Sequence, residues 1–119
     1  GTWDLIEKGD YGRDVAFLDD AMAWTFNRAN VDPARIAIGG FSDGASAVIG
    51  IGLANGDLFS DVLAFSPGFF VAPGRRGAPS VFVSHGTGDQ VLSYDVTSEQ
   101  IVPALVEMGL GVEFVSFRF

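Results

Sequence analysis

The sequence of residues 36–44, IAIGGFSDG, places a G-x-S-x-G pentapeptide between an apolar run and a segment of small residues. The apolar run before the pentapeptide predicts a β-strand, and residues 44–55 after it predict a helix. This strand–turn–helix context is that of a nucleophile elbow, in which a serine is held on a tight turn with its hydroxyl exposed. Side chains at Gly40 and Gly44 would clash with nearby backbone in such a turn. The pattern predicts Ser42 as a nucleophile, against the alternative of an ordinary structural turn.

The rest of the chain alternates between helical and strand patterns. An apolar stripe with helical spacing predicts a helix over residues 14–30. Short apolar runs predict strands at 35–41, 62–65, 81–84 and 112–119, and a further helix is expected over 95–108 with Gly109 as its C-cap. This alternation with short loops predicts a single α/β domain over residues 1–119, built on a parallel sheet.

Two further polar residues fall at the same rim of the predicted sheet as Ser42. His85 and Asp89 follow the end of the third strand, and functional sites of parallel sheets lie at the carboxyl ends of the strands. An acid that follows the serine on a strand-end loop fits the chain order Ser, Asp, His of α/β-hydrolases. The backbone N–H of Asp43, the residue after the nucleophile, is the expected donor to an oxyanion.

Three segments together resemble a known family. They are DPARIAIGGFSDGA at 32–45, LAFSPG at 63–68 and HGTGDQV at 85–91. In this order they resemble α/β-hydrolases of the phospholipase/carboxylesterase group, which includes acyl-protein thioesterases and dienelactone hydrolases. The resemblance implies a partial α/β-hydrolase fold of about four parallel strands with flanking helices. It also implies a serine esterase that cleaves carboxylic esters or thioesters through an acyl-enzyme on Ser42, with Asp89 as the acid and with no metal or cofactor.

The resemblance leaves the general base without an expected position. In the family, the catalytic histidine follows the strand that residues 112–119 resemble. The family fold also has further strands before the part that residues 1–119 resemble. The sequence contains one histidine, His85. A structural role at the strand end is expected for it, and the alternative is a surrogate base. The competing hypothesis for the whole chain is a catalytically incomplete domain that acts as a non-enzymatic oligomer or binding module.

Composition narrows the classes of partner. The net charge of −8 argues against nucleic acid and anionic membranes as partners, and no apolar run is long enough for a membrane span. The absence of cysteine excludes disulfides, and one histidine excludes a multi-histidine metal site. With no visible signal peptide, the cytoplasm is the favoured compartment.

Aromatic and apolar residues suggest contact surfaces. Phe41, Phe69 and Phe70 lie near the expected rim and are candidate substrate-pocket residues. The hydrophobic content of 48% is high for a small domain. An uncovered sheet face and an unpaired first strand would both expose apolar surface, so we expect a homodimer through that face or edge.

Overall fold

The computed structural model describes residues 12–71 and 74–118, and it contains one four-stranded sheet. The strands β1 (Ala37–Phe41), β2 (Asp61–Phe65), β3 (Ser80–Gly86) and β4 (Val112–Phe117) lie side by side in chain order, and every pair is parallel. All four predicted strands and the parallel topology are confirmed. The described helices are α2 (Gly12–Phe26), α3 (Asp43–Ala54), α4 (Tyr94–Val96) and α5 (Val102–Glu107).

The helix predicted over 95–108 differs in one respect from the structure. Residues Thr97–Ile101 between α4 and α5 form a π-helical segment. Pro103 lies in the first turn of α5, and a proline has no N–H to donate to the preceding turn. Because this hydrogen bond is missing, the helix can widen into a π-helical turn just before the proline. Gly109 follows this helix with φ 83°, the left-handed conformation predicted for its C-cap.

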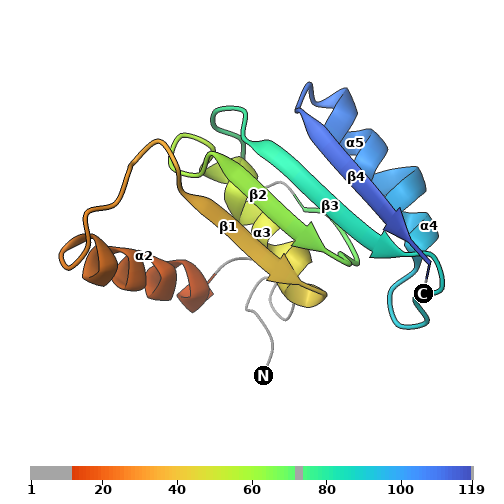
Figure 1. Cartoon of the computed structure of the whole chain (residues 1–119), viewed down its shortest axis with the longest axis horizontal. Coiled ribbons are helices and arrows are strands. Elements are labelled where there is room, and N and C mark those ends of the chain that lie inside the picture. Colours follow the sequence, from red (N-terminus) through yellow and green to blue (C-terminus); the bar gives the residue numbers. More distant parts are fainter. Residues whose placement is uncertain (1–11, 72–73, 119) are drawn as a thin grey trace.

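One face of the sheet is covered by α3 and by the α4–α5 run (Figure 1). The strand residues on this face alternate with those on the other, as a pleated strand requires. Val62, Ala64, Val81 and Val83 on this face are almost completely buried, and they pack with Ile49, Leu53 and Leu105 of the helices. The helices that follow β1 and β3 thus cover the same face, as right-handed crossovers require.

The opposite face of the sheet is open within the described residues, and Figure 1 views the molecule from that side. Phe65 and Phe82 pack there with ring centroids 5.9 Å apart. Phe41, Phe65, Val115 and Phe117 keep between 40% and 72% of their surface exposed. Within the described residues β1 pairs only with β2, so its outer edge is also unpaired. Exposed apolar residues grouped in this way are a candidate interaction surface.

We therefore expect the chain to self-associate through this face or edge, because both offer apolar surface and unpaired backbone groups. Sedimentation equilibrium at micromolar concentration measures the mass directly. The predicted result is a dimer, and a replacement such as Phe117→Ser should shift the equilibrium toward the monomer. A monomer at all accessible concentrations would contradict the prediction.

Candidate active site

Ser42 occupies the turn between β1 and α3 in a conformation that few non-glycine residues adopt. Its φ is 60° and its ψ is −121°. A side chain in this region costs of order 1–3 kcal/mol and persists only where the surroundings determine it. Here the amide of Ser42 donates to the carbonyl of Phe65 at 2.9 Å, and the carbonyl of Ser42 accepts from the amide of Ser46 at 3.2 Å. The turn is thus held by the neighbouring strand on one side and by the first turn of α3 on the other.

Gly40 is required by this turn for a steric reason. A Cβ atom at Gly40 would overlap the carbonyl group of Gly44, and it would come within 2.9 Å of the amide nitrogen of Ala45. The obstructing atoms belong to the backbone at the start of α3, which cannot move aside as a flexible side chain would. The predicted role of Gly40 is confirmed.

Asp89 lies on the loop after β3, where two backbone amides fix its carboxylate. Its Oδ1 accepts hydrogen bonds from the amides of Val91 at 2.9 Å and Leu92 at 3.0 Å. These two bonds, Leu92 first, lower the pKa of the Asp89 carboxyl below its ordinary value, and the nearby His85 ring adds to the effect. Asp89 is therefore a stable anion at neutral pH, as the acid of a catalytic triad must be.

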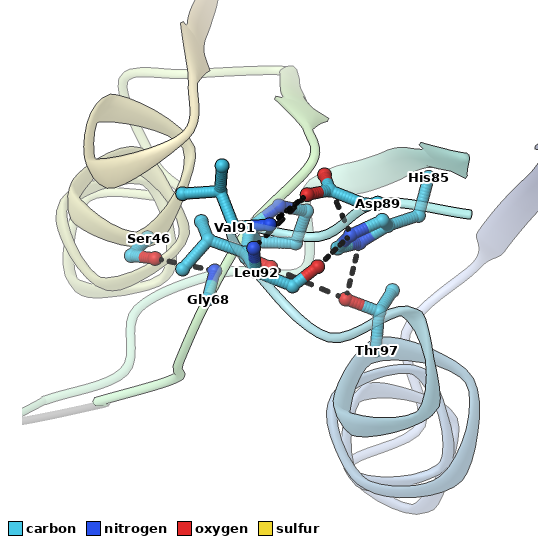
Figure 2. A network of polar contacts seen from close by, with 8 residues as sticks. Ser46, Gly68, His85, Asp89, Val91, Leu92 and Thr97 are labelled. Carbon is cyan, nitrogen blue, oxygen red and sulfur yellow. Dashed lines mark hydrogen bonds and ion pairs between the residues drawn. The ribbon is translucent and has the colours of Figure 1, made fainter. Parts of the chain in front are cut away.

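His85 is fully buried, and both of its ring nitrogens have partners (Figure 2). Nδ1 lies 2.8 Å from the hydroxyl of Thr97. Nε2 lies 2.9 Å from the carbonyl of Leu92 and 3.3 Å from Oδ2 of Asp89. Because both groups facing Nε2 are acceptors, Nε2 carries a proton. This geometry favours the structural role for His85, since it ties the Asp89 loop to the helix that follows.

A second polar clamp holds the loop after β2. The Oγ atom of Ser46 accepts from the amides of Gly68 at 2.9 Å and Phe69 at 3.2 Å. On the other side, the hydroxyl of Thr97 lies 3.3 Å from the carbonyl of Pro67. Ser46 and Thr97 are both fully buried. The loop is thus fixed between α3 and the π-helical segment.

A cleft of about 680 Å³ opens at the carboxyl ends of β1, β2 and β3. Its lining residues are Phe41, Ser42, Ser66 and Gly88 to Leu92. Ser42 and Asp89 therefore face one cleft, as the strand-end argument predicts. Phe41 lines it too, whereas Phe69 and Phe70 do not, and Phe70 packs against the core instead. Sequence reasoning missed Ser66, because SPG at 66–68 signals only the end of a strand.

Solved structures with a similar arrangement are esterases and related hydrolases. Esterase PE8 is 30% identical over 87% of this chain and 47% of its own, with a TM-score of 0.72. A thermostable esterase is 18% identical over 99% of this chain and 32% of its own, with a TM-score of 0.77. MGS-M1, an α/β hydrolase enzyme from a Medee basin deep-sea metagenome library, is 22% identical over 92% of this chain and 50% of its own, with a TM-score of 0.68.

The chain has an α/β-hydrolase fold. It spans between about a third and a half of the length of these hydrolases, so its sheet corresponds to part of theirs. No protein-family model matches the sequence, and a search of curated proteins finds no match. The resemblance to the esterase group noted from the sequence agrees with these structural neighbours.

Neither a metal site nor a membrane-spanning helix finds support in the described part of this hydrolase fold. Within residues 12–71 and 74–118, no group of three or more His, Asp or Glu side chains is placed to hold a metal ion. None of the helices described there is long and apolar enough to cross a membrane.

The close approach at the elbow predicts that replacing Gly40 destabilises the fold more than replacing Gly111. Gly40→Ala should lower the free energy of unfolding by about 3 kcal/mol, because the methyl group meets fixed backbone rather than a movable side chain. Gly111→Ala is the matched control, since a Cβ there meets nothing within 4 Å. Urea unfolding of both variants measures the difference. Equal stabilities would contradict the close approach at the elbow.

Proposed function

We propose that this chain is a serine esterase, which cleaves carboxylic esters or thioesters through an acyl-enzyme on Ser42. The observation that carries the proposal is the conformation of Ser42, with φ 60° at the end of β1, in one cleft with an anionic Asp89. The esterases among the structural neighbours support hydrolysis of esters at the level of the fold class. The cleft volume suits substrates with small to medium acyl groups.

In the proposed reaction, Oγ of Ser42 attacks the carbonyl carbon of the ester and loses its proton to a base. The backbone N–H of Asp43 stabilises the oxyanion that forms, and a donor of this kind contributes about 10²–10³ in rate. The base then protonates the leaving alcohol or thiol as the C–O or C–S bond breaks. Water attacks the acyl-enzyme in the same way and releases the acid, which restores Ser42.

The base is the part of the proposal that these residues do not supply in their present arrangement. His85 has both ring nitrogens engaged with Thr97, Leu92 and Asp89, and it does not line the cleft. Asp89 lines the cleft, and its Oδ2 lies 3.3 Å from Nε2 of His85. The proposal therefore requires a proton acceptor other than those that residues 12–71 and 74–118 place in the cleft, or a rearrangement that frees His85. Asp89 would orient such a base and stabilise its cationic form.

Hydrolysis of p-nitrophenyl butyrate tests the proposal. The wild type should release p-nitrophenolate faster than buffer, and Ser42→Ala should return the rate to that of buffer because the nucleophile is lost. Ser80→Ala is the matched control, since Ser80 is an exposed serine at the opposite end of the sheet. Wild-type hydrolysis no faster than Ser42→Ala would remove the enzyme proposal and leave the non-enzymatic alternative.

The His85→Gln variant should keep the wild-type activity per folded molecule. A loss of activity in this variant would favour His85 as a surrogate base.

A further inference from the structure

A second serine in the cleft shares the unusual backbone conformation of Ser42. Ser66 directly follows β2 and has φ 57°. Phe41 and Phe65, which precede the two serines, are register partners in the sheet. Ser42 donates its amide to the carbonyl of Phe65, and Ser66 donates its amide to the carbonyl of Ser84 at 2.8 Å. Because neighbouring strands are about 5 Å apart, the two serines lie next to each other at the rim.

The hydroxyl of Ser66 has no hydrogen-bond partner among the residues that the structure describes. Only 8% of the Ser66 surface is exposed, yet the residue lines the cleft. A buried hydroxyl is normally paired, because leaving it unpaired costs free energy. Its left-handed backbone adds a further cost that a glycine would avoid. The amide bond to Ser84 holds the backbone of Ser66, but no contact of the hydroxyl within the described part of the chain offsets its burial.

The position of Ser66 determines which atoms its hydroxyl can reach. The strand order β1-β2-β3 places Ser66 between the nucleophile and the loop that carries Asp89. An acyl group attached to Oγ of Ser42 would lie in the cleft that Ser66 also lines. Phe41, Val91 and Leu92 give the cleft an apolar part, and its other polar side chains are Ser42, Asp89 and Gln90. In a largely apolar pocket, a few precisely placed polar groups fix the orientation of the ligand and its specificity.

We propose that Ser66 is a substrate-contacting residue, whose hydroxyl donates a hydrogen bond to an acceptor atom on the acyl chain about two bonds from the carbonyl carbon. The substrate class is then esters or thioesters with an oxygen near the carboxyl group, such as alkoxy or oxo acids. This inference rests on the proposed esterase function. It goes beyond that function by naming the residue that selects the acyl group.

The test compares two esters with acyl chains of equal length. p-Nitrophenyl methoxyacetate carries an ether oxygen where p-nitrophenyl butyrate carries a methylene group. In the wild type, kcat/KM should favour the ether, and in Ser66→Ala this preference should fall by about 2- to 10-fold, the effect of one neutral hydrogen bond. The intrinsic reactivities of the esters cancel between variants. Ser80→Ala is again the control and should keep the wild-type preference.

An equal loss on both esters would overturn the proposal, because Ser66 would then act on the nucleophile or its base. An unchanged preference in Ser66→Ala would overturn it as well. If the wild type hydrolyses neither ester, the esterase function fails. The contact between Ser66 and the acyl oxygen is then tested by NMR titration with methoxyacetanilide and butyranilide, the anilides of the same two acids. A preference for methoxyacetanilide that Ser66→Ala abolishes supports the contact. Equal affinities, or no binding, contradict it.

A second variant separates substrate contact from a role in folding. Ser66→Gly fits φ 57° without strain and removes the hydroxyl. It should raise the midpoint of thermal unfolding and lose the preference for the ether. A lowered midpoint would show that the hydroxyl has a structural partner, and that result would contradict the proposal.

Discussion

The left-handed turn at Ser42 is the constraint on which the site depends. It requires glycine at position 40, because a Cβ there would overlap the backbone at the start of α3. It also requires β2, whose last carbonyl accepts the amide of Ser42. The turn presents Ser42 at the strand end and sets the amide of Asp43 at the first turn of a helix, where the helix dipole stabilises anions. The proposed nucleophile and the proposed oxyanion donor are therefore products of one local geometry.

The parallel register extends this geometry across the sheet. It brings Ser42, Ser66 and the Asp89 loop to one rim, and two buried polar clamps then fix the loops between them. Ser46 holds the loop after β2 from α3, and Thr97 holds both Pro67 and His85 from the π-helical segment (Figure 2). Wide helical turns of this kind occur frequently at functional sites. Here the π-helical turn carries the Thr97 hydroxyl, which contacts both Pro67 and His85.

The elements of the fold and the main site residues could be predicted because their signals are local. Apolar runs bounded by turn residues determine the four strands, and the glycine spacing around Ser42 determines the elbow. Other features depend on tertiary contacts that no local pattern reveals. The bonding of His85 comes from Thr97 and Leu92, and the amide of Ser66 is held by the carbonyl of Ser84 on β3. Phe70 packs against the core, directly after the two residues whose amides the Ser46 hydroxyl binds.

The central claim is that Ser42 is a nucleophile in the cleft it shares with Asp89. Covalent labelling tests this most directly. Diethyl p-nitrophenyl phosphate transfers its diethylphosphoryl group to an activated serine oxygen and releases p-nitrophenolate. Intact mass followed by peptide mapping then locates the adduct. The account predicts one adduct per chain, located on Ser42 and absent from Ser42→Ala. An unlabelled chain, or an adduct on another serine, would contradict it.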